Sequence, residues 1–184
     1  MFNPTQIVIQ AFVEQLKGKY GQIYGVLEPA YPDIIGFVGR LALENIANSD
    51  AAYHDMNHTI MVTLVGQEIL LGKHTSEGGV RPRDWLHFMI SLLCHDIGYV
   101  RGIFVQDDED GFVIDAAGNK VTLPRGASDA ELLPHHVDRS KLYIMERIQG
   151  IAELDAERIA RAVEGSRFPS SMPADVERID EEAA

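Results

Sequence analysis

Two pairs of side chains in this 184-residue chain have the types and the spacing of metal ligands. His54 and His58 are four residues apart, so on one helix they would face the same side, roughly 40° apart about the axis and roughly 6 Å along it. His95 is followed directly by Asp96 at the end of a strongly apolar segment, where an ionised carboxylate is costly unless it is paired or bound to a metal. Each residue alone also fits a structural role, but together the four indicate a metal centre.

A further acid repeats the setting of Asp96. Glu164 is expected in the last turn of a helix before Gly165, where unpaired carbonyl groups favour a cation. The combined set offers two imidazoles and two carboxylates: His58, His95, Asp96 and Glu164. Mn, Fe, Mg, Zn and Ni all accept such a set, so we expect one or two divalent ions whose identity the ligand types leave open.

A second histidine pair follows Pro134 at an expected helix start. Two neutral imidazoles, His135 and His136, could serve a second metal. The helix N-terminus and Arg139, which lies on the same face as His135, could instead hold an anion. Solvated or locally hydrogen-bonded histidines are the third interpretation, and the sequence leaves all three open.

The charge of the chain excludes several classes of partner. Asp and Glu outnumber Lys and Arg by 28 to 16, a formal net charge of −12. Such a surface repels phosphate backbones, so we expect neither nucleic-acid nor anionic-membrane binding. A small phosphorylated substrate can still bind where metal ions reverse the local sign.

The remaining composition is that of a folded protein of ordinary size. The single cysteine, Cys94, lies in an apolar run and is expected in the core, and a disulfide framework within the chain is excluded. No apolar stretch is long enough to span a bilayer, and the first residues do not resemble a signal peptide. We expect one soluble, cytoplasmic domain over residues 1–184.

Helical periodicity dominates the chain and predicts an all-α fold of about seven helices. Asn3 and Pro4 are typical of a helix start, and Gly18 and Gly21 of its end. The longer predicted helices cover residues 4 to 18–21, 32–47, 48–50 to about 71, 85–97, 134–149 and 155–164. A single turn is predicted at 128–131, and one more turn or a frayed tail after Pro173.

One segment departs from the helical pattern. Two strand-like runs, 111–115 and 119–123, flank Ala116-Ala117-Gly118, which predicts a β-hairpin insertion at residues 111–123. An acidic run at 107–110 precedes it. Because the non-helical connection is unusually long, the insertion is either a lid over a site or a passive surface flap.

Three motifs in this order resemble the HD-domain metal-dependent phosphohydrolases. They are Tyr-His-Asp-Met-Asn-His at 53–58, Leu-Cys-His-Asp-Ile-Gly at 93–98 and Ala-Val-Glu-Gly-Ser-Arg-Phe-Pro at 162–169. The first is most similar to a motif of the class I cyclic-nucleotide phosphodiesterases. The resemblance spans roughly residues 52–169 and implies an HD-domain helical bundle.

The resemblance also implies roles for individual residues. By position, the first metal would be bound by His58, His95, Asp96 and Glu164, with Asp96 bridging to a second ion where two are present. His54 would give a proton to the leaving oxygen while a metal-activated hydroxide attacks a phosphate ester. Three basic side chains are candidates for holding phosphate oxygens: Arg139, Lys141 and Arg167.

The chain departs from the family pattern at three positions. Glu164 stands where the family usually has Asp, Asp55 where the phosphodiesterase motif has Asn, and Tyr99 where those enzymes have another histidine. The chain is also shorter than their catalytic domains and has no recognisable purine-binding region. These differences favour a small phosphohydrolase, acting on a nucleotide or another phosphomonoester or diester, over a cyclic-nucleotide phosphodiesterase.

Two other functions remain open from the sequence. A di-iron oxygenase on the same scaffold would use His135 or His136 as extra nitrogen ligands. A non-catalytic helical module, such as a ligand sensor, could keep a metal for stability alone. The apolar helix faces are also compatible with a homodimer.

Overall fold

The computed structural model describes residues 3–167 and is mainly helical, which confirms the predicted all-α class. The elements are α1 (Pro4–Tyr24), α2 (Tyr31–Ile46), α3 (Met56–Glu77), α4 (Pro82–Cys94), the 3-10 helix η1 (Ile97–Tyr99), β1 (Phe112–Val113), β2 (Lys120–Val121), the 3-10 helix η2 (Asp129–Leu132), α5 (His136–Arg147) and α6 (Ala156–Glu164). Among these residues, no helix is both long and apolar enough to cross a membrane. The predicted tail after Pro173 lies outside the described residues.

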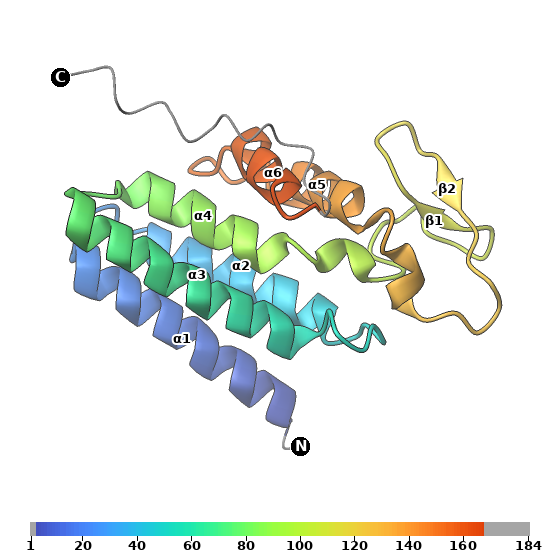
Figure 1. Cartoon of the computed structure of the whole chain (residues 1–184), viewed down its shortest axis with the longest axis horizontal. Coiled ribbons are helices and arrows are strands. Elements are labelled where there is room, and N and C mark those ends of the chain that lie inside the picture. The colour runs from blue at the N-terminus through green and yellow to red at the C-terminus, as the bar shows by residue number, and fades with distance from the viewer. Residues whose placement is uncertain (1–2, 168–184) are drawn as a thin grey trace.

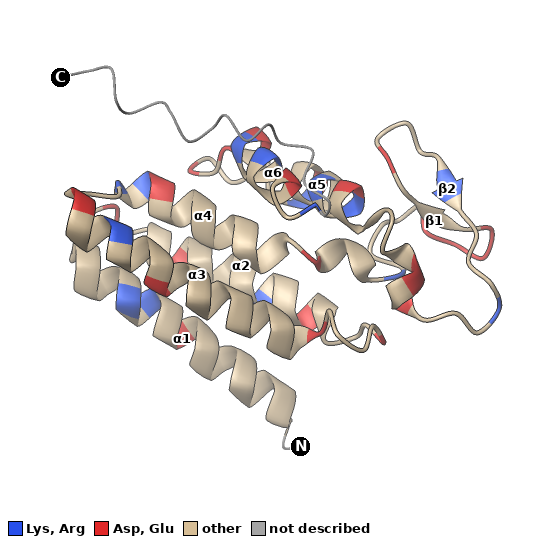
Figure 2. Cartoon of the chain, viewed as in Figure 1, with Lys and Arg blue, Asp and Glu red and all other residues tan. Residues whose placement is uncertain are grey.

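Helix α4 is the centre of the arrangement. It packs against α2, α3 and α6, and α1 packs on α2 while α5 packs on α6 (Figure 1). The charged residues of α4 lie at its start and the rest of its ribbon is uncharged (Figure 2). Its side chains Trp85, Leu86, Met89, Ile90 and Leu93 are almost fully buried. Cys94 is buried as predicted, and burial raises the pKa of its thiol to about 12.

Helix α1 begins as predicted and ends later than predicted. Asn3 caps it, accepting the backbone N–H of Gln6, but the helix continues past both internal glycines to Tyr24. A glycine inside a helix costs about 1 kcal/mol relative to alanine. Burial of Tyr20 and Tyr24 in the core offsets that cost, so tertiary packing overrides the local signal.

The predicted start of the third helix is wrong. Helix α3 begins at Met56 because Asp55 caps it, its carboxylate accepting the backbone N–H of His58 at 2.8 Å. His54 therefore lies in the connection before α3 rather than one turn inside it. Likewise α4 ends at Cys94, so that Asp96 lies in the short turn between α4 and η1 instead of on the helix.

The predicted hairpin is present. β1 and β2 pair antiparallel, with Phe112 opposite Val121, at the end of the molecule beyond η1 (Figure 1). The segment before the hairpin is fixed by a fully buried ion pair between Arg139 and Asp107, whose carboxylate also accepts the backbone N–H of Val113. The insertion is therefore anchored to α5 through its first half.

Candidate metal centre

Three imidazole nitrogens converge on one carboxylate oxygen. Oδ2 of Asp96 lies 2.8 Å from Nδ1 of His54, 3.3 Å from Nε2 of His58 and 3.1 Å from Nε2 of His95. Asp96 is only 2% exposed, so the oxygen is screened from solvent. The predicted convergence of the His54–His58 and His95–Asp96 motifs is therefore found in the structure.

These distances fit a set of metal ligands. Metal–nitrogen bonds of about 2.1 Å place neighbouring ligand atoms of one ion roughly 3.0–3.4 Å apart. The separations of His58 and His95 from Asp96 lie close to that range. Within residues 3–167, the one group of histidine, cysteine and acidic side chains whose ligand atoms all lie within 4.8 Å of one another is His54, His58 and Asp96. The residues present thus fit a divalent ion.

The second ring nitrogen of His95 supports this assignment. Nδ1 of His95 lies 2.7 Å from the carbonyl oxygen of Leu92, which can only accept a hydrogen bond, so Nδ1 carries a proton. In the neutral ring Nε2 is then a lone-pair donor that faces the lone pairs of Asp96 at 3.1 Å. A cation between the two atoms, or a second proton on the ring, turns this repulsion into attraction.

The electrostatics of the cluster keep Asp96 ionised. Burial opposes its ionisation, but hydrogen bonds and charge from His95 and His54 outweigh burial and lower the pKa of the carboxyl to about 2. Burial lowers the pKa values of His58 and His136. Near pH 7 these two imidazoles are therefore neutral, which is the form that binds metals.

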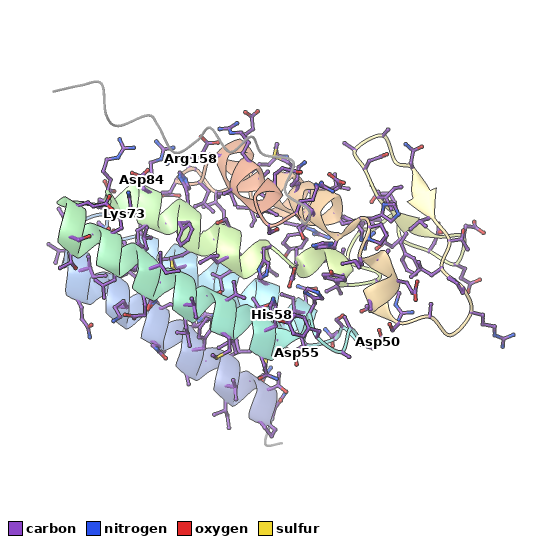
Figure 3. The ribbon with its side chains drawn as sticks, viewed as in Figure 1. Asp50, Asp55, His58, Lys73, Asp84 and Arg158 are labelled. Carbon is purple, nitrogen blue, oxygen red and sulfur yellow. The ribbon has the colours of Figure 1, made fainter. Side chains whose placement is uncertain are left out.

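Local structure explains how distant segments reach this point. Asp55 fixes the first turn of α3 and so the position of His58; Figure 3 shows both residues at the start of that helix. Gly98 in η1 approaches α5 so closely that a Cβ there would lie 2.0 Å from the carbonyl oxygen of His136. Ser140 on α5 accepts the N–H of Gly98 and donates to the carbonyl of His95. The turn that carries Asp96 is therefore held against α5.

Tyr99 joins two of the histidines. Its ring is stacked between those of His54 and His136, with centroids 4.4 and 4.5 Å apart and planes within 17° and 16° of parallel. The ring is buried, and its hydroxyl has no hydrogen-bond partner among residues 3–167. The sequence showed Tyr99 only as a departure from a family pattern; the stacking role has no signal in periodicity or spacing.

A cavity of about 770 Å³ opens beside the cluster. The cluster residues and Tyr99 line it together with His136 of α5 and Arg167 after α6. The rest of the described wall consists of Ser166 and four apolar side chains: Val62, Leu133, Pro134 and Val137. No residue of the hairpin insertion is among the described lining, so the structure does not support the lid interpretation.

Glu164 was predicted to be a metal ligand, but it does not join the group around Asp96. Its carboxylate instead lies 2.8 Å from Nζ of Lys141 and forms an ion pair with Arg167. Lys141 and Arg167 also contact Asp138, so two cations and two carboxylates balance one another. The side-chain hydrogen bond from Arg167 is the largest cause that lowers the pKa of Glu164, to about 2. Lys141 and Arg167, predicted to hold phosphate, are thus occupied by carboxylates.

The prediction that Arg139 binds phosphate is wrong. The side chain is fully buried, and its donors meet the carbonyl oxygens of Gly98, Val100 and Val113 as well as the carboxylate of Asp107. It has no donor left for a ligand and fixes the chain that follows η1.

The structure places the two histidines of the second pair, His135 and His136, in different surroundings. His136 lines the cavity, and its Nδ1 donates to the carbonyl oxygen of Leu133 at 2.6 Å, which leaves Nε2 as its free nitrogen. His135 precedes α5 and is not among the described cavity residues. Of the two residues predicted for a second metal, only His136 is placed beside the first centre.

Comparison with known proteins assigns the chain to a family. No curated protein and no solved structure shows significant similarity to it. Residues 2–182 match a family model described as Npun_R2479-like, a description that names no activity. The match covers nearly the whole chain, and the protein therefore belongs to the Npun_R2479-like family.

Proposed function

We propose that this protein is a metal-dependent phosphohydrolase built on an HD-type helical bundle. The observation that carries the proposal is the convergence of His54, His58 and His95 on one buried oxygen of Asp96, at the wall of a cavity large enough for a small molecule. The ordered motifs at 53–58 and 93–98 supply the link to phosphate-ester chemistry.

In this proposal the ion would be held by His58, His95 and Asp96, the ligands that the resemblance implies, whereas the group whose ligand atoms all lie within 4.8 Å of one another has His54 in place of His95. A bound divalent ion supplies an activated water at neutral pH and offsets negative charge on phosphoryl oxygens. The backbone carbonyl of Leu92 fixes the ring of His95 with its Nε2 toward Oδ2 of Asp96, so that this nitrogen could bind an ion there. Burial among the helices keeps bulk water from Asp96 and would strengthen the electrostatic attraction between its carboxylate and a bound ion.

His54 is the proposed proton donor. Asp96 holds its Nδ1 at 2.8 Å and Tyr99 stacks on its ring, so the ring orientation is fixed. Its Nε2 has no hydrogen-bond partner in residues 3–167, and the residue lines the cavity. Hydrolysis forms a bond from water oxygen to phosphorus and breaks the ester P–O bond. The leaving alkoxide takes the proton of His54, which regains one from solvent.

The test is an assay of protein loaded separately with Mn, Fe, Mg, Zn or Ni against nucleotides, cyclic nucleotides and alkyl and aryl phosphates. We expect turnover that depends on the ion and is lost in His95→Ala. His74→Ala, a change of the same type far along the chain, should keep full turnover. The absence of turnover with every ion, or equal turnover in His95→Ala, would reject the function.

An oxygen-activating di-iron centre is the alternative that one observation favours. The ring of His136 lies 6.2 Å from that of His54, centroid to centroid, so a further nitrogen ligand is close to the first centre. Iron-specific binding with oxygen consumption would support this alternative. Turnover of phosphate esters with redox-inert Mg or Zn would exclude it as the main activity.

A further inference from the structure

The cavity beside the metal centre offers a substrate very little positive charge. Arg167 is the one lysine or arginine among its described lining residues. Its guanidinium is already paired with Asp138, at 2.8 Å, and with Glu164. The neighbouring Lys141 is held by the same two carboxylates. Charge on a substrate must therefore be balanced at the metal centre itself.

This balance disfavours polyphosphates. Nucleoside di- and triphosphates carry several negative charges, and their binding sites supply lysine, arginine or backbone N–H groups for each phosphate. Here the charge of Arg167 is already balanced by Asp138 and Glu164, on a chain whose formal net charge is −12, so no described lining cation is left for a second or third phosphate. The arrangement matches a substrate with one phosphoryl group.

Apart from Ser166, whose hydroxyl donates to the carbonyl oxygen of Val163, the rest of the described cavity wall is apolar. Val62 comes from α3, Leu133 and Pro134 follow η2, and Val137 belongs to α5. Leu133 is 56% exposed, so its side chain is accessible to a ligand in the cavity. No asparagine or glutamine side chain, the types that read the edge of a nucleobase, is in the described lining. A cavity of about 770 Å³ leaves room beyond one phosphate.

We propose that the substrate is a phosphomonoester of an apolar or aromatic alcohol, whose phosphoryl group meets the metal centre while its alcohol part lies against Leu133, Pro134, Val62 and Val137. This inference rests on the proposed phosphohydrolase function and narrows it. The apolar wall binds the leaving group, and the phosphate lies at the metal centre beside His54 and His136.

The test compares hexyl phosphate with glycerol phosphate and ATP on the metal-loaded protein. A glycerol alkoxide leaves at least as readily as a hexyl alkoxide, so a preference for the hexyl ester must come from binding. We expect kcat/KM for hexyl phosphate to exceed that for glycerol phosphate by roughly tenfold or more. Leu133→Asn should reduce this ratio. Leu27→Asn, the same change at a leucine that is 59% exposed and lies outside the cavity, should not.

A binding measurement separates the inference from catalysis. Calorimetric titration with hexylphosphonate and with 2-hydroxyethylphosphonate, neither of which is hydrolysed, should give the lower Kd for hexylphosphonate. Leu133→Asn should narrow the difference between the two Kd values. Preference for glycerol phosphate or ATP, equal phosphonate affinities, or a ratio unchanged by Leu133→Asn would overturn the substrate class and leave the hydrolase function standing. A protein that hydrolyses none of the esters would instead reject the function itself.

Discussion

Nδ1 of His54 lies 2.8 Å from Oδ2 of Asp96, although 42 residues separate the two in the chain. The same oxygen is 3.3 Å from Nε2 of His58. His54 is thus placed either to present its other nitrogen to a substrate or to bind the ion directly. The proposed mechanism assigns it the first of these roles.

His54→Ala should separate metal binding from proton donation. Loss of a positioned general acid typically reduces turnover by about 10²- to 10⁴-fold. We expect that loss in His54→Ala with metal content unchanged, whereas His58→Ala should lose the ion as well. Elemental analysis and kcat measured on the same preparations check this. If His54→Ala loses the ion to the same extent as His58→Ala, then His54 is a ligand rather than the proton donor.

Tyr99 should act through its ring and not through its hydroxyl. Because the buried hydroxyl has no partner, Tyr99→Phe removes an uncompensated polar group and should raise the free energy of unfolding by up to about 1 kcal/mol, with turnover unchanged. Tyr99→Leu removes the stacking on His54 and His136 and should lower kcat. Thermal unfolding and steady-state kinetics of both variants test this. Equal loss of kcat in both would show that the hydroxyl is needed.

A buried threonine on α3 predicts a stabilising substitution. Oγ1 of Thr63 is buried and has no hydrogen-bond partner in the described part of the chain, so Thr63→Val should raise the free energy of unfolding by about 1 kcal/mol. Thr59 is the matched control, since its Oγ1 donates to the carbonyl of Asp55 and Thr59→Val should destabilise. Urea unfolding measures both. Destabilisation by Thr63→Val would mean that a water or another group pairs with this hydroxyl.

Glu164 should stabilise the fold in a pH-dependent way. Its folded pKa of about 2 lies below the ordinary value of 4.5, so its ion pairs contribute fully above pH 4.5 and are lost as the pH falls toward 2. Glu164→Gln should therefore lower the free energy of unfolding by about 1 kcal/mol at pH 7. The difference from the unchanged protein should shrink steadily below pH 4.5. A difference that is constant from pH 7 to pH 2.5 would contradict the assigned ion pairs.

The sequence predicted the parts of the fold and site that depend on local pattern. Apolar periodicity located the main helices, and turn residues located the hairpin, because both signals act over a few neighbouring residues. The spacing of His54 and His58 and the His95-Asp96 pair predicted side chains that the structure brings together at Oδ2 of Asp96. The prediction that His54 lies on the third helix was wrong. Residues 48–50 and Asp55 can all cap the start of that helix, and the sequence cannot rank them without the tertiary contacts.

The errors concern residues whose partners are distant in sequence. An acid before a glycine at a helix end looks the same for Asp96 and Glu164, yet one meets three histidines and the other meets Lys141 and Arg167. Arg139 was predicted to hold phosphate oxygens. Its burial depends on carbonyl groups about 26 to 41 residues away that leave one pocket for a guanidinium. Such long-range pairing has no signature in a single sequence.

Metal content is the most direct test of the central claim. Protein purified without chelators, incubated with Mn, Fe, Mg, Zn or Ni and then dialysed, should retain at least one of these ions stoichiometrically by elemental analysis. Asp96→Asn, with folding verified by circular dichroism, should retain none, while Glu164→Gln should retain as much as the unchanged protein. Failure of the unchanged protein to retain any divalent ion, or equal retention by folded Asp96→Asn, would contradict the proposed metal centre.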